Sequence, residues 1–206
     1  TQPNFRLPGI RAAAEAVAKA EIAEKPLALW PQELLEIAEI GAETGCRILM
    51  NIQLRYFPQY GALREVIRSG RLGEVDFIRA STWGGALAMG PHLLSQLMMI
   101  LDDARPEAVW ATAAGLEGYD WSHGAPGHLQ AAYWFPGNRR VFWECKPRGL
   151  GNRAGAPDYW MHLDLDFFCS NGVAWTQQVG RWGYQARGEV EVFKEHTDNY
   201  AQIHDG

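Results

Sequence analysis

The chain has 206 residues, of which 47% are hydrophobic and 21% are charged, and its formal net charge is −5. This composition is typical of a globular protein with a sizeable core and argues against a disordered chain. The acidic balance, without a basic run or stripe, argues against extensive contacts with nucleic-acid phosphates.

The cysteines and the hydropathy pattern indicate the cellular compartment in which the protein is expected. Cys46, Cys145 and Cys169 are far apart and form no CxxC pair, which favours reduced thiols over a disulfide framework. No apolar run approaches the ~20 residues that a membrane-spanning helix needs. The first residues also lack the basic and apolar regions of a signal peptide. We therefore expect a cytoplasmic protein that has no membrane partner.

The N-terminal third alternates between helical and strand patterns. Helical spacing over residues 5–20 is followed by a short strand at Ala20–Ala23, and Pro31 opens a second helix that stops at Gly45. Arg47–Ile52 resembles a buried strand, and Pro58 begins a third helix that ends near Gly70. This alternation is typical of a parallel α/β sheet.

After Gly73 the pattern changes to consecutive strands. Val75–Trp83 is strand-like, and one more helix lies within Gly90–Leu101. Turn residues then separate six β-rich segments, which predict a mostly antiparallel sheet. These segments are Ala108–Ala113, His128–Phe135, Arg139–Cys145, Met161–Cys169, Val173–Gln177 and Trp182–Gln185.

The two patterns together predict an α+β fold with a boundary near residues 70–73. Residues 1–72 would form the C-terminal part of a Rossmann-like, dinucleotide-binding domain. Residues 73–206 would form an open, mostly antiparallel sheet with a helix packed on one face, in a domain for substrate binding and oligomerisation. The glycine-rich loop that cradles a dinucleotide pyrophosphate is not in the sequence. We therefore expect a fragment that is also truncated at its C-terminus and, by itself, inactive.

The segment Glu24-Lys25-Pro26 stands at the carboxyl end of the first predicted strand. Ligands of open α/β sheets bind outside the carboxyl ends of strands, and a following proline restricts a lysine to an extended conformation. A lysine placed in this way can exchange a proton with a substrate hydroxyl if its pKa is lowered. A solvated surface lysine is the alternative that the tripeptide alone leaves open.

The order of motifs along the chain resembles the Gfo/Idh/MocA oxidoreductases, which include glucose-fructose oxidoreductase and inositol dehydrogenase. Five segments carry this resemblance, in the order in which the family has them. They are Thr1–Asn4, Ala18–Ala28 around Glu24-Lys25-Pro26, Asn51–Pro58, Ile67–Val75, and Gly84–Leu94, which contains His92.

The resemblance implies an NAD- or NADP-dependent dehydrogenase that acts on a sugar, a polyol or a related cyclic compound. Lys25 matches the catalytic lysine beside the nicotinamide and the substrate hydroxyl, and His92 matches an acid/base or substrate-binding histidine. The residues implied to line the cofactor are Pro3, Asn4, Glu24, Lys25, Pro26 and Arg55. The resemblance also implies a homo-oligomer that forms through the β-sheet.

One departure keeps a second hypothesis open. Many family members carry a carboxylate four residues before the histidine, where this chain has Ala88. A non-catalytic binding or oligomerisation module is therefore the alternative to a dehydrogenase. The retention of both Lys25 and His92 favours the enzyme.

Other polar and aromatic residues were weighed against plain structural roles. His92 follows Gly90-Pro91 and is expected at a helix N-terminus, where the helix dipole disfavours an imidazolium. Trp83 is the best candidate to stack on a sugar ring, whereas the other strand tryptophans fit core packing. Two further groups have plain structural explanations: the first as a solvated loop, so that we expect no metal site, and the second as the wet face of the sheet, with a sugar-binding surface or an equally possible oligomer contact as its alternatives. These groups are Asp120, His123 and His128, and His162, Asp164 and Asp166.

Overall fold

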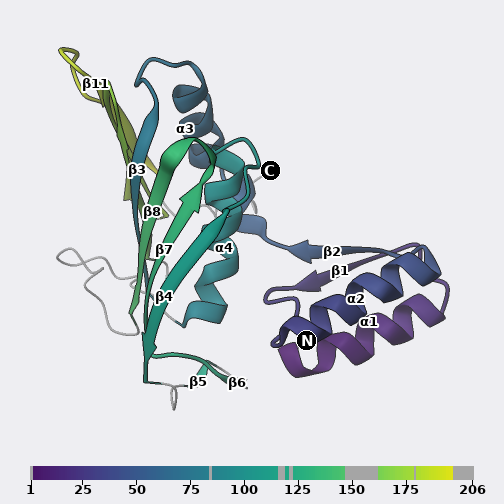
Figure 1. The fold of residues 1–206 in the computed structure, drawn as a ribbon. Helices are drawn as coiled ribbons and strands as arrows, with labels where there is room; N and C mark the ends of the chain where they lie inside the picture. Colours follow the sequence, from purple (N-terminus) through teal and green to yellow (C-terminus); the bar gives the residue numbers. More distant parts are fainter. Residues whose placement is uncertain are drawn as a thin grey trace.

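The computed structural model describes residues 2–83, 85–115, 119–120, 123–146, 162–178 and 180–196. The chain folds into a small α/β part and a larger part built on an eight-stranded sheet (Figure 1). The small part lies on the side of the large sheet that carries helices, so the opposite face of that sheet is turned away from it.

The small part consists of two parallel strands and the helices that cover them. A short 3-10 helix, η1 (Pro3–Phe5), leads into α1 (Arg6–Glu15), and α2 (Pro31–Thr44) follows β1 (Ala20–Glu24). Strand β2 (Arg47–Asn51) pairs in parallel with β1, as the alternating pattern predicted. The small part has its own core, which contains Ile10, Ala14, Ala23, Ile37, Ile40 and Cys46.

Helix ends in this part follow local capping chemistry. The Glu33 side chain accepts hydrogen bonds from the backbone N–H groups of Leu29 and Trp30, and Gly45 ends α2 in a left-handed conformation. Helix α1 ends earlier than its alanine-rich pattern suggested. Val17 there adopts a positive φ of 62°, and the Ala18 N–H bonds to the Ala13 carbonyl, which closes the last turn.

The prediction that β2 is a buried strand is wrong. Leu49 of β2 remains 55% exposed and Ile22 of β1 remains 71% exposed. Both helices lie on one side of the strand pair, so the side chains that point to the other side are uncovered in this structure (Figure 1). The apolar composition of a strand indicates that its faces can be buried, but it does not show whether other elements cover them.

A 3-10 turn and a helix join the small part to the large sheet. The turn is η2 (Gln53–Tyr56) and the helix is α3 (Pro58–Arg68), which begins at its proline as predicted. Strand β3 (Val75–Trp83) has the predicted bounds, and α4 (Ala86–Ile100) follows it. Helix α4 begins four residues before the predicted segment, so Pro91 lies inside it.

The large sheet has the strand order β12-β11-β10-β9-β3-β8-β7-β4. Only the β3–β8 pair within it is parallel, which confirms the predicted α+β fold with a mostly antiparallel sheet. The other strands are β4 (Ala108–Ala114), β7 (His128–Phe135), β8 (Arg139–Lys146), β9 (Leu163–Cys169), β10 (Gly172–Gln177), β11 (Gly180–Ala186) and β12 (Val192–His196).

Several details were not predicted. Strand β12 has no counterpart among the predicted segments, and the loop after β4 contains the short pair β5 (Tyr119–Asp120) and β6 (His123–Gly124). The turn η3 (Pro136–Asn138), by contrast, connects β7 and β8 where turn residues predicted one, with Gly137 at a φ of 77°. The glycine- and arginine-rich loop expected at Gly149–Ala156 lies outside the described residues.

Helices α3 and α4 cover one face of the large sheet and form the main core with it. Trp143 of β8 is buried there and donates a hydrogen bond of 2.9 Å from its indole N–H to the Thr82 hydroxyl. A Cβ atom at Gly90 would approach the Trp143 ring to 3.1 Å, so the glycine allows α4 to lie close to β8. Within the described ranges, no helix is long and apolar enough to cross a membrane.

The opposite face of the sheet, here called the open face, carries exposed aromatic side chains. Phe77 of β3 and Phe168 of β9 lie opposite each other with ring centroids 5.8 Å apart. Trp134 and Phe142 are also exposed on strands β7 and β8. Exposed apolar patches of this kind are typical of interaction surfaces.

Candidate functional site

Lys25 connects the two parts of the molecule. It follows Glu24, the last residue of β1, so it stands at the carboxyl end of that strand as predicted. Its ammonium Nζ donates a hydrogen bond of 3.0 Å to the backbone carbonyl of Ala88 in α4. A residue of the small part is thereby fixed to the helix that carries His92.

His92 lies inside α4 and not at its N-terminus. The helix begins at Ala86 with Gly85 as its N-cap, so His92 stands in the second turn, and the predicted dipole effect of a helix end does not apply. Its side chain is buried, with only 3% of the residue exposed. Burial, followed by the positive charge of Lys25, lowers the pKa of His92 to about 4. The imidazole is therefore neutral at pH 7, as expected, but for a different physical reason.

The lysine and the histidine are brought together through one turn of α4. The Ala88 carbonyl that binds Lys25 lies four residues before His92, which places both on one side of the helix. A charged hydrogen-bond donor and a neutral imidazole thus stand next to each other. This pair can hold a hydroxyl group and exchange its proton.

The segments predicted to line a cofactor meet at the carboxyl edge of the small sheet. Asn51, the last residue of β2, donates a hydrogen bond of 2.5 Å to the Glu24 carboxylate. The buried Arg6, at the start of α1, donates to the Pro26 carbonyl. Desolvation lowers the pKa of Arg6, and the Glu24 charge opposes that effect. Pro3 and Asn4 belong to η1, which ends at Phe5, the residue before this arginine.

Arg55 has protein partners that the sequence did not reveal. Its guanidinium forms an ion pair with Asp103 at 2.7 Å and a hydrogen bond with the Ser95 hydroxyl at 3.4 Å. Both partners belong to α4 or to the turn that follows it. Arg55 therefore ties η2 to α4, whatever else it contacts.

Trp83 is not brought together with Lys25 and His92. Thr82, its neighbour in β3, points to the helix-covered face, where its hydroxyl accepts a hydrogen bond from Trp143. Because successive side chains of a strand point to opposite faces, Trp83 projects towards the open face. The expectation that Trp83 stacks on a substrate held by Lys25 therefore conflicts with the register of β3.

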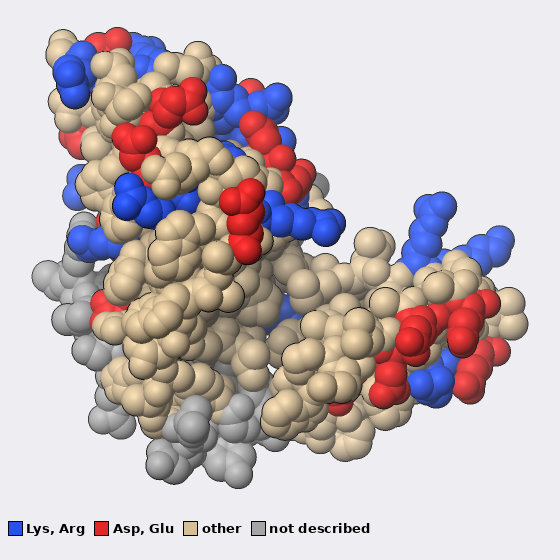
Figure 2. All heavy atoms as spheres, in the orientation of Figure 1, with Lys and Arg blue, Asp and Glu red and all other residues tan. Residues whose placement is uncertain are grey.

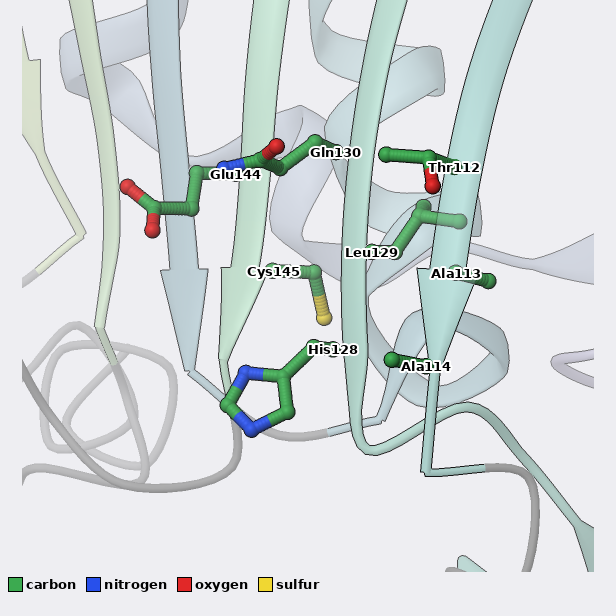
Figure 3. Close-up of a pocket in the computed structure, with 8 residues that line it drawn as sticks. All are labelled: Thr112, Ala113, Ala114, His128, Leu129, Gln130, Glu144 and Cys145. Atoms are coloured by element: carbon green, nitrogen blue, oxygen red, sulfur yellow. The ribbon is translucent and has the colours of Figure 1, made fainter.

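The other polar groups on the open face form no metal site among the described residues. His162 lies 3.0 Å from the Ser81 hydroxyl through Nε2 and 3.6 Å from the Asp164 carboxylate through Nδ1. A shallow hollow of about 240 Å³ lies at strands β4, β7 and β8 (Figure 3). Thr112, His128, Gln130 and Glu144 contribute polar side chains to it, and no predicted catalytic residue does.

The surface is hollowed where the two parts of the molecule meet (Figure 2). Few charged side chains are visible in this notch, whereas acidic side chains gather over α1 and α2. Three features near the site were missed from the sequence: the Arg6 contact, the Ala88 carbonyl and the buried Gln96. Backbone acceptors and contacts between distant segments leave no local sequence pattern.

Comparison with known proteins gives both sequence and structural relatives. No protein-family model matches the chain. It is 32% identical over 146 residues to the uncharacterized oxidoreductase ORF334 of Rhizobium meliloti, a match that covers 63% of this chain and 42% of that protein. It is 30% identical over 112 residues to the trans-1,2-dihydrobenzene-1,2-diol dehydrogenase of Mus musculus, covering 47% of this chain and 34% of that protein.

Solved structures match almost the whole chain. An inositol dehydrogenase homolog from Azotobacter vinelandii, crystallised with NADH and myo-inositol, superposes with a TM-score of 0.77 at 14% identity, over 95% of this chain and 54% of that chain. The fold is that of the Gfo/Idh/MocA oxidoreductases. This confirms the resemblance seen in the order of the sequence motifs.

The Gfo/Idh/MocA fold does not by itself fix an activity. A super-repressor mutant of Gal80p from Saccharomyces cerevisiae superposes with a TM-score of 0.79 at 15% identity, over 95% of this chain and 62% of that chain. The chain also spans less than half the length of the curated oxidoreductases it matches. Function must therefore be argued from the residues of the site.

Proposed function

We propose that the chain belongs to an NAD- or NADP-dependent oxidoreductase. This enzyme would transfer a hydride between the nicotinamide and the hydroxyl-bearing carbon of a sugar, a polyol or a related cyclic compound. The observation that carries the proposal is the placement of Lys25 on α4, one turn from a buried and neutral His92. The curated dehydrogenases among the sequence relatives support this class of reaction.

Lys25 would hold the substrate hydroxyl and take part in its proton transfer. Its ammonium donates a hydrogen bond to the Ala88 carbonyl, which holds the charged group at α4, where it could donate to a hydroxyl oxygen. The same ammonium stabilises the partial negative charge that grows on that oxygen when its proton leaves. Fixing the lysine on a helix lowers the cost of ordering its flexible side chain.

His92 would act as the second group at the hydroxyl. Because its pKa is about 4, one ring nitrogen keeps a lone pair at neutral pH and can accept a proton or a hydrogen bond. The adjacent Lys25 charge keeps the imidazole neutral, which suits a hydrogen-bond acceptor. Burial of the imidazole shields it from bulk water and strengthens its interactions.

The residues at the carboxyl edge of the small sheet fit a nicotinamide nucleotide. Glu24 and Pro26 stand at the carboxyl end of β1, the edge where open α/β sheets bind nucleotides, and Pro3 and Asn4 would complete the cofactor site there. When bound, the nicotinamide supplies the hydride donor or acceptor. Residues 1–72 would thus serve the nucleotide, and residues 73–206 would serve the substrate and subunit contacts.

The open face would form the contact between subunits of a homo-oligomer. It presents exposed Phe77, Trp134, Phe142 and Phe168, whereas the other face is covered by α3 and α4. Aromatic residues of this kind dominate the energetics of subunit interfaces. An ion pair of 3.7 Å between Arg79 and Asp166 lies among them and would add specificity.

A non-catalytic binding module is the second candidate, and Ala88 favours it because no carboxylate stands one turn before His92. The two candidates differ in turnover. The test joins the chain to a Rossmann half that carries a glycine-rich loop, incubates the product with NAD or NADP and a panel of polyols that includes myo-inositol, and follows nicotinamide reduction. Reduction that depends on the polyol supports the oxidoreductase, whereas nucleotide binding without reduction of any polyol supports the binding module.

A further inference from the structure

Two fully buried polar side chains lie behind His92. Gln96 follows His92 by one helical turn on α4, and Tyr60 comes from the neighbouring helix α3. Helical side chains lean towards the N-terminus of their helix, so the Gln96 amide leans towards the turn of His92. The Tyr60 phenol lies close to the Gln96 amide. The three side chains therefore form one polar line through an apolar core.

The polar atoms of this line lack normal hydrogen-bond partners elsewhere in the described structure. They are Nδ1 of His92, both amide atoms of Gln96 and the Tyr60 hydroxyl. Buried polar groups are almost always paired, because an unpaired group loses its hydrogen bonds to water without replacement. The chemistry of the three groups is complementary, so small rotations let them pair with one another.

We propose that Gln96 is a positioning residue that fixes the tautomer of His92. The Gln96 carbonyl accepts a hydrogen bond from the Nδ1–H of His92, and its amide NH₂ donates to the Tyr60 oxygen. The imidazole then keeps its lone pair on Nε2. The role of that lone pair at a substrate hydroxyl rests on the proposed function, but the tautomer itself does not.

This arrangement explains how His92 can be oriented although the chain has Ala88 in place of a carboxylate. A carboxylate next to a histidine orients the ring but also favours its protonated form. A neutral amide orients the ring without that effect. Two charged groups lie around the line. Lys25, which follows β1, opposes protonation of His92, and Asp164 of β9 raises the pKa of Tyr60. Arg55 of η2 contacts α4 at Ser95.

Nitrogen-15 NMR of the histidine side chains in the full chain tests the proposal without cofactor or substrate. At pH 7, His92 should show mainly the Nδ1–H tautomer, assigned by the loss of its signals in His92→Gln. Gln96→Met should shift the tautomer ratio towards Nε2–H by about fivefold, the factor that one ordinary hydrogen bond supplies. Tyr60→Phe should produce a smaller shift in the same direction.

Gln59→Met is the matched control, because Gln59 is a buried glutamine on α3 with an unpaired amide nitrogen. It should leave the His92 tautomer unchanged. Should Gln96→Met fail to fold, Tyr60→Phe still decides, since it removes a single hydroxyl. An unchanged tautomer in folded Gln96 and Tyr60 variants, or an equal shift in Gln59→Met, would overturn the proposal. Either result leaves the oxidoreductase assignment standing, since that assignment depends on turnover.

Discussion

The Lys25 ammonium and the Ala88 carbonyl, 63 residues apart in the chain, are joined by a hydrogen bond of 3.0 Å. This contact fixes the end of β1 to the first turn of α4, one turn before the buried His92. In a relative that has a carboxylate in place of Ala88, the lysine would meet a charged partner. Here the lysine meets a neutral backbone group, and its charge, after desolvation by burial, contributes to the lowered pKa of His92.

The stability of the chain should fall with acidification because of His92. Its pKa is about 4 in the folded state and close to 6.5 in an unfolded chain, so the unfolded state binds the proton first. The stabilisation from the neutral imidazole is complete above pH 6.5 and is lost as the pH falls to 4. The loss is about 2–3 kcal/mol, measured by urea unfolding across this range.

His92→Gln tests whether His92 causes this fall in the free energy of unfolding with pH. Glutamine keeps a polar side chain of similar reach but cannot titrate between pH 4 and pH 6.5. The variant should lose most of the pH dependence in that window. An unchanged slope would assign the effect to other groups.

Ala88→Asp should raise the pKa of His92 towards its ordinary value. The new carboxylate would stand one helical turn from the imidazole and next to the Lys25 ammonium, whose charge it would partly neutralise. An NMR titration of the His92 ring should show a rise of about 1 unit or more, in the range that an adjacent opposite charge produces. Ala86→Asp, on a different side of α4, should leave the pKa near 4.

Arg55→Met and Asp103→Asn separate two roles of the arginine. Both variants break the ion pair, which is partly exposed, so each should cost about 1 kcal/mol of stability or less. Asp103 has a φ of 56°, a conformation that asparagine tolerates. If Arg55 also contacts the nucleotide, as the family resemblance implies, Arg55→Met alone should weaken NADH binding by about tenfold. Equal binding by both variants would restrict Arg55 to its structural role.

Phe77→Lys should dissociate the proposed homo-oligomer. The change places a charge at the centre of the open face, beside Phe168 and Arg79. Central aromatic positions of interfaces carry about 2 kcal/mol or more, so subunit association should weaken at least about thirtyfold in sedimentation measurements. Val190→Lys, in an exposed turn outside this face, should leave association unchanged. A monomeric wild-type chain at high concentration would contradict the assignment of this face.

The fold was predictable where the sequence carries local signals. Proline and glycine mark both ends of α2, and alternation defines β3 to the residue. The sequence predicts a start for α4 that is too late in the chain, because a proline usually opens a helix. Pro91 instead lies inside a helix that begins at Ala86. The exposure of Leu49 depends on which layers cover β2, and no property of the strand itself reports this.

The site was predictable only in part. The family order of the motifs indicates Lys25 and His92, and in the structure Lys25 binds the Ala88 carbonyl one helical turn before His92. The contact itself uses a backbone carbonyl, which every residue possesses, so no residue type could indicate it. Gln96 was missed because a glutamine in an apolar helix has no distinctive pattern until its burial is known.

The central claim is that Lys25 performs chemistry at this site. The most direct measurement compares turnover by Lys25→Ala and Lys19→Ala, each in the chain joined to a Rossmann half that carries a glycine-rich loop, with NAD or NADP and the most active polyol. Lys19 is an exposed lysine near the start of β1 and has no side-chain role in the site. The account predicts that Lys25→Ala lowers kcat at least about a hundredfold with little loss of stability, while Lys19→Ala stays near the wild type. Equal turnover by the two variants would contradict it.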